Sequence, residues 1–164
     1  MPDTFEIFDR TPAEIARLYG APLGTTAGGP MGPGRANAKG AYKFTKDTGA
    51  YNVEIGFDAD DAVCYAIFEK KNGGALDEIE ARHFLLQCAA GAEWTDVTPA
   101  AWNPKAKRNV LARGYRDYQC RVPGANKTVK RVLLARHQWR PGRLAVWTLS
   151  WQADIGKELG ARIA

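Results

Sequence analysis

The chain has 164 residues, of which 45% are hydrophobic and 25% charged. These values are typical of one globular domain with a core, so we expect a single domain over 1–164. No apolar run approaches the roughly 18 residues of a membrane span. The first residues, MPDTFEIFDR, lack the apolar segment of a signal peptide, which predicts a cytoplasmic protein, exported only if a signal peptide was removed.

The net charge of +5 is distributed unevenly along the chain. Residues 1–99 carry 9 Lys/Arg and 15 Asp/Glu, whereas residues 100–164 carry 14 and 3. This asymmetry indicates either a basic half that meets an acidic partner or two halves that complement one another.

Three widely spaced cysteines, Cys64, Cys88 and Cys120, form neither a disulfide framework nor a zinc-site spacing. We expect them to be small buried hydrophobic residues. In an exported protein, a Cys64–Cys88 or a Cys64–Cys120 bridge would be the alternative.

A short helix is predicted over 11–19, in RTPAEIARLYGAP. Thr11 is a good N-cap, Pro12 suits the first helical position, and Glu14 completes a capping box. Gly20 ends the helix. The helix spans only about two turns, so it needs a packing partner.

Residues 20–42 hold seven glycines and three prolines. The stretch lacks the G-K-[ST] of a phosphate-binding loop, and its prolines remove backbone N–H donors. It is therefore predicted to be an ordinary surface loop. A partner-binding or gating loop is the alternative, because loops of about 20 residues are uncommon in compact domains. Its candidate contact residues are Gly28, Gly29, Arg35 and Lys39.

Three strands are predicted over 41–47, 50–61 and 62–74, joined by short turns. The turn between the last two carries Asp58, Asp60 and Asp61, with Glu69 at the twelfth position of a calcium-loop pattern. The sixth position of that pattern requires glycine and is valine here, so we expect an acidic turn and no metal site.

A longer helix is predicted over 75–91. One apolar stripe comprises Leu76, Ile79, His83, Leu86 and Ala90, while Phe84, Leu85 and Cys88 lie on the other side, so we expect more than one face to be covered. His83 and His137 are interpreted as structural histidines. His83 and Cys88 are about 140° apart on the helix and form no local nucleophile–base pair.

The second half begins with an irregular connection over 93–109. Strands are expected over 110–122, 128–139 and 144–151, and a weak helix over 152–164. Helices grouped with runs of strands predict an α+β fold. We expect an antiparallel sheet of about six strands in two meanders, packed on helix 75–91 with helix 11–19 as support. The halves 11–70 and 75–151 are a possible duplication.

Arginines alternate with aromatic residues after residue 112. The candidate binding residues for an acidic partner or a nucleic acid are Arg116, Arg131, Arg136, Trp139, Arg140, Arg143 and Trp147. Arginine and aromatics on a sheet are typical of single-stranded nucleic-acid platforms. Strand parity argues against a single platform, because Arg131 and Arg136 are five residues apart and point to opposite faces.

The helix TPAEIARLYGAP is followed by YKF and then by VEIGFDADDAVCYAIF. In these elements residues 11–68 resemble the helix-plus-meander modules of SmpA/OmlA-type outer-membrane assembly lipoproteins and of β-lactamase-inhibitor-protein-like domains. The resemblance covers about a third of the chain. It implies a non-enzymatic protein-binding module and carries over no binding residue.

Together these patterns predict a non-catalytic protein-interaction or assembly module without a cofactor. Its basic C-terminal half would bind an acidic protein partner or a second copy of the chain. The alternative is a single-stranded nucleic-acid-binding protein. An enzyme of unrecognised class is the third hypothesis, because no catalytic motif is found.

Overall fold

The computed structural model describes residues 7–26, 40–46, 49–57, 61–89, 93–111, 114–123 and 130–149. Several sequence predictions fall outside these ranges: the contact residues Gly28, Gly29, Arg35 and Lys39, the turn residues Asp58 and Asp60, and the tail helix over 152–164.

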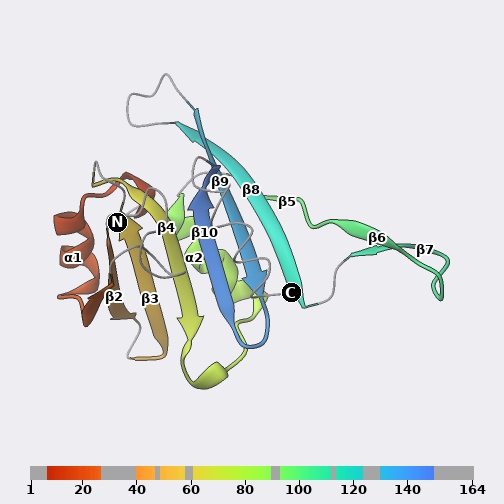
Figure 1. Cartoon of the computed structure of the whole chain (residues 1–164), viewed down its shortest axis with the longest axis horizontal. Helices are drawn as coiled ribbons and strands as arrows, with labels where there is room; N and C mark the ends of the chain where they lie inside the picture. Colours follow the sequence, from red (N-terminus) through yellow and green to blue (C-terminus); the bar gives the residue numbers. More distant parts are fainter. Residues whose placement is uncertain are drawn as a thin grey trace.

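The described strands form an eight-stranded sheet and a separate two-stranded hairpin (Figure 1). The order in the large sheet is β1-β2-β3-β4-β10-β9-β8-β5, and every pairing is antiparallel. The strands of the large sheet are β1 (Gly24–Thr26), β2 (Gly40–Lys46), β3 (Tyr51–Phe57), β4 (Val63–Lys70), β5 (Thr95–Asp96), β8 (Tyr115–Pro123), β9 (Lys130–Gln138) and β10 (Arg143–Thr148).

The α+β class and the antiparallel sheet are confirmed. The six predicted strands correspond to β2, β3, β4, β8, β9 and β10, and each meander presents its last strand to the other, so that β4 pairs with β10. The strand count was too low because β1 and β5 are only three and two residues long. Strands this short show no alternation of apolar and polar residues.

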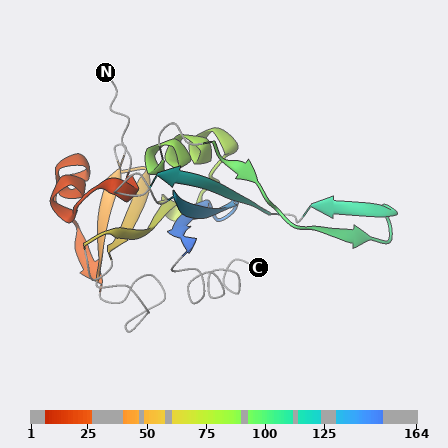
Figure 2. The same ribbon diagram turned by 90° about the horizontal axis from the view of Figure 1, so that it is seen from above.

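The main hydrophobic core lies between one face of the sheet and the helices (Figure 2). The helical elements are η1 (Ile7–Asp9), α1 (Pro12–Tyr19), η2 (Lys71–Gly73) and α2 (Glu78–Cys88). Phe84 of α2 stacks on Phe68 of β4 with ring centroids 4.3 Å apart. Removing such rings from water is the main contribution to the stability of the fold.

The predicted start of α1 is confirmed. Thr11 is the N-cap, its hydroxyl accepts from the Glu14 amide, and the Glu14 carboxylate accepts from the Thr11 amide. Gly20 follows the helix with φ of +84°, a conformation that favours glycine.

The expectation that more than one face of the longer helix is covered is wrong for the stripe through Ile79 and Leu86. Ile79 and Leu86 are 81% and 49% exposed, and His83 is also exposed, whereas the face with Phe84 and Leu85 is buried. Both faces are apolar in the sequence, and the ring stack on Phe68 decides between them. The helix also starts later than predicted, at Glu78, because Asp77 is its N-cap and forms a capping box with Glu80.

A clamp holds the start of α2 against the sheet. The Glu80 carboxylate accepts hydrogen bonds from Tyr51 and from the Lys70 ammonium, the latter at 2.5 Å. Burial raises the pKa of Glu80. The hydrogen bonds from Lys70, Tyr51 and the Asp77 amide together outweigh this effect and lower the pKa to about 2. Glu80 therefore stays ionised in the folded protein.

All three cysteines are buried, as predicted. Burial raises the pKa of the Cys88 thiol, which keeps it protonated.

Candidate functional site

A β-hairpin projects from the body of the molecule (Figures 1 and 2). It consists of β6 (Ala100–Asn103) and β7 (Arg108–Leu111), and we call residues 100–111 the arm. The prediction of an irregular connection over 93–109 and one strand over 110–122 is therefore wrong. At the tip, the Asn103 side chain accepts from the amides of Lys105 and Ala106, which closes the turn.

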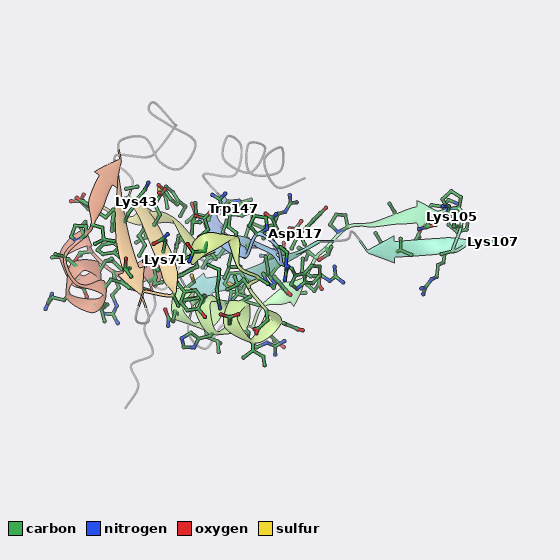
Figure 3. The ribbon with its side chains drawn as sticks, turned by 90° about the horizontal axis from the view of Figure 1, so that it is seen from below. Lys43, Lys71, Lys105, Lys107, Asp117 and Trp147 are labelled. Atoms are coloured by element: carbon green, nitrogen blue, oxygen red, sulfur yellow. The ribbon has the colours of Figure 1, made fainter. Side chains whose placement is uncertain are left out.

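The surface of the arm is basic and carries an exposed tryptophan. Trp102 is 62% exposed. Lys105, Lys107 and Arg108 are exposed, and Figure 3 shows the two lysines at the far end of the arm. The sequence has no Asp or Glu between Asp96 and Asp117. None of the three cations forms an ion pair with a residue that the structure describes.

The base of the arm is tied to β8 by Thr98. The Thr98 hydroxyl accepts from the Asp117 amide at 2.9 Å and donates to the Asp96 carboxylate at 2.5 Å. The Val97 amide also donates to the Asp117 carbonyl at 2.8 Å. The arm therefore starts from a fixed point on the sheet.

Arg136 is bound within the molecule. Its guanidinium donates to both oxygens of Asp117, at 2.7 and 2.9 Å, and lies 4.2 Å from the centre of the Tyr115 ring. The hydrogen bond to Asp117 raises the pKa of Arg136. Bidentate pairing satisfies this guanidinium internally, so it is a poor candidate for a partner contact.

Arg116 and Trp139 contact each other on the face of the sheet opposite to that of Arg136. The Arg116 guanidinium lies 4.9 Å from the centre of the Trp139 ring, and its Nε lies 4.0 Å from Asp96. The register pairs Arg116 with His137 but Asp117 with Arg136, which places Arg116 and Arg136 on different faces. The predicted set is thus split into two internal clusters.

The other predicted residues are separate. Arg143 lies 3.8 Å from Glu69, and Arg140 is exposed in the turn before β10. Trp147 is buried on the face opposite α2, where its Nε1 has no hydrogen-bond partner among the described residues (Figure 3). Arg131 is paired with Val122 in the β8–β9 register, and its side chain lies outside the description.

Two of the hollows on the surface of the body are lined by residues that the structure describes. The first, which we call the groove, has a volume of about 350 Å³ and lies between α2 and β8. Leu85, Leu86, Trp94 and Tyr118 give it an apolar lining, and Glu78, Glu93 and Arg82 add charges. The Trp94 ring is fixed by donating from Nε1 to the Leu85 carbonyl at 3.1 Å.

The second hollow, of about 400 Å³, lies on the face opposite α2. Lys43 and Glu54 border it with Nζ and Oε1 3.8 Å apart, and Arg143 and Glu69 lie beyond them. Tyr65 donates to Glu54 at 2.9 Å, and burial raises the pKa of its phenol. Opposite charges across this hollow largely neutralise one another.

The histidines do not combine with a nucleophile in the described residues. His137 is 1% exposed and donates from Nε2 to the Leu76 carbonyl at 2.7 Å, and burial lowers its pKa. His83 accepts from the Gln87 amide on the surface of α2. His137 therefore has the internal contact of a structural histidine, whereas His83 is exposed. Among the described residues, no group of three metal-ligating side chains is found.

The arm is the feature that sequence reasoning missed. One signal could have revealed it: the run from Val97 to Arg116 contains five Lys/Arg and no Asp/Glu, with an Asn-Pro turn between alternating segments. The strands are only four residues long, too short to stand out by periodicity.

Comparisons with family models, with curated proteins and with solved structures find no significant match to this chain. The resemblance of residues 11–68 to the SmpA/OmlA-type modules stays a prediction. In the described part of the chain, no helix combines the length and apolar character needed to cross a membrane.

Proposed function

We propose that this protein is a non-catalytic interaction or assembly module that binds an acidic partner surface through its arm. The contact element moves from Arg116 and Arg136, which have internal partners, to the arm cations Lys105, Lys107 and Arg108. The implied likeness to helix-plus-meander binding modules agrees with this role.

The observation that carries the proposal is the unbalanced charge of the arm. A hairpin outside the body contributes little to the core, and its cations have no described carboxylate to pair with. Trp102 adds an aromatic surface, and tryptophan and arginine are the residues most often found at the energetic centre of interfaces. A polyanionic or acidic surface would pair with the cations of the arm and cover Trp102.

A single-stranded nucleic acid is the second candidate. The same arm offers backbone neutralisation by cations and base stacking on Trp102. The two candidates differ in what they require of the partner, because stacking needs nucleobases whereas charge pairing does not.

A binding titration tests the proposal. Fluorescently labelled polyglutamate and a labelled single-stranded DNA of equal charge are titrated with the protein at low and at moderate salt. We expect the triple variant Lys105→Gln, Lys107→Gln, Arg108→Gln to bind polyglutamate about tenfold more weakly, since each exposed pair contributes only a fraction of a kcal/mol.

The matched control removes three exposed cations elsewhere, in Arg17→Gln, Lys43→Gln, Arg121→Gln, and has the same net charge. Its binding should equal that of the parent protein. Equal loss in both variants would mean that net charge, and not the arm, governs binding, which contradicts the proposal. Strong binding of the DNA with a steep salt dependence, and none of polyglutamate, would favour the nucleic-acid candidate.

A further inference from the structure

The groove matches the arm in chemistry. The groove combines an apolar lining with the carboxylates of Glu78 and Glu93, whereas the arm combines Trp102 with three cations. Arg82 also lies in the groove, but it pairs with Glu78 at 3.4 Å and leaves the balance negative. The exposed Leu86 continues the apolar surface at its border.

The groove also lies at the base of the arm. Trp94 directly precedes β5, and Tyr118 pairs with Asp96 of that strand. The arm points away from its own groove, so its tip does not fill it (Figure 2). When two arms lie side by side in opposite directions, each tip comes to the base of the other arm. That arrangement is related by a two-fold axis and closes on itself.

The arm presents edges suited to this arrangement. β6 and β7 pair only with each other among the described strands, so each has an outer edge with unpaired backbone groups. Such edges readily pair with another strand, and an isolated two-stranded hairpin is marginally stable in water. A second arm alongside would satisfy the groups along one edge of each arm.

We propose that a second copy of this chain is the partner of the arm, in a two-fold dimer in which each arm docks in the groove of the other copy. This inference rests on the proposed function, and it identifies the acidic partner surface as the groove of the second copy. Trp102 meets the apolar lining of the groove, and Lys105, Lys107 and Arg108 meet Glu78 and Glu93.

Reciprocal charge reversal tests the dimer by light scattering after gel filtration. The arm variant Lys105→Glu, Lys107→Glu, Arg108→Glu and the groove variant Glu78→Lys, Glu93→Lys should each be monomeric where the parent protein is dimeric. An equimolar mixture of the two should form a dimer again, because both of its arm–groove contacts bring opposite charges together.

Circular dichroism and thermal unfolding confirm that each variant is folded. Lysine in the first turn of α2 opposes the helix dipole. If the groove variant is unfolded, Glu78→Gln, Glu93→Gln replaces it, and its dimer dissociation constant should rise about tenfold. The control Arg17→Gln, Lys43→Gln, Arg121→Gln should remain dimeric.

A monomeric parent protein, or dimers that persist in both reversed variants, would overturn the dimer. The proposed function is judged separately by the polyglutamate titration: a monomer whose arm still binds polyglutamate retains the function with a different acidic partner. A monomer whose arm binds single-stranded DNA alone would assign the arm to nucleic acid instead.

Discussion

The arm and the strands at its base use the same residue types with opposite results. At the base, Arg136 is held by Asp117 and Tyr115, and Arg116 contacts Trp139. In the arm, Trp102 and three cations are exposed, and no carboxylate lies between Asp96 and Asp117 to pair with them. Basic and aromatic composition therefore identifies a surface only where the fold provides no internal partner.

The largest expected difference between body and arm concerns two aromatic side chains. Phe84→Ala removes a ring that is 1% exposed and stacked on Phe68, and should lower the free energy of unfolding by about 3–5 kcal/mol. Trp102→Ala should change the stability of the monomer by less than about 0.5 kcal/mol. Urea unfolding of dilute protein measures both, and equal losses would show that the arm belongs to the core.

Acid should weaken the body through the Glu80 clamp. The pKa of Glu80 is about 2 in the folded protein against 4.5 in the unfolded chain. The stabilisation is therefore complete above pH 4.5 and is lost as the pH falls toward 2. It is on the order of 2 kcal/mol, because Glu80 retains some contact with water.

Urea unfolding between pH 6 and pH 2 measures this loss, and Glu80→Gln should flatten the curve over that range. The arm contains no carboxylate, so the arm contributes nothing to this loss of stability in acid. A curve with the same slope in Glu80→Gln and in the parent protein would contradict the assignment to Glu80.

A smaller effect is expected at the Arg136–Asp117 pair. Asp117→Ala leaves a half-buried guanidinium without its bidentate partner and should cost about 1.5 kcal/mol. Arg82→Gln is the control, because its pair with Glu78 is exposed and contributes at most about 0.5 kcal/mol. Thermal unfolding that lowers the midpoint equally in both variants would show that burial of the pair is unimportant.

The smallest predicted change tests the anchor of the arm. Thr98→Val keeps the shape of the side chain but removes the acceptor of the Asp117 amide, at a cost of about 1 kcal/mol. Faster hydrogen exchange at Asp117 should accompany it. The amide of Phe68, in the centre of the sheet, serves as the reference, and faster exchange there as well would indicate general unfolding.

Sequence reasoning found the elements that depend on local signals. The capping box of Thr11 and Glu14 and the alternation of β3 and β4 each follow from a few neighbouring residues. The buried face of α2 depends on Phe68, which is remote in the sequence, and both faces of the helix are apolar enough to be buried.

The candidate site was harder to predict for a related reason. A charged side chain is available for a partner only when it is not paired with another group inside the molecule. Asp117 takes Arg136 because the β8–β9 register places them opposite each other, and that register cannot be read from composition. The lysines of the arm were passed over because the arm itself was not recognised as a hairpin.

The anchoring of the arm has a consequence for how this fold can change. β5 and β8 are already hydrogen-bonded neighbours where the arm leaves the sheet, so the segment over 100–111 enters and exits between strands that pair without it. The hairpin is therefore an exchangeable part. Its length, tip and charge can drift during evolution, or be redesigned, while the sheet and its core remain as they are.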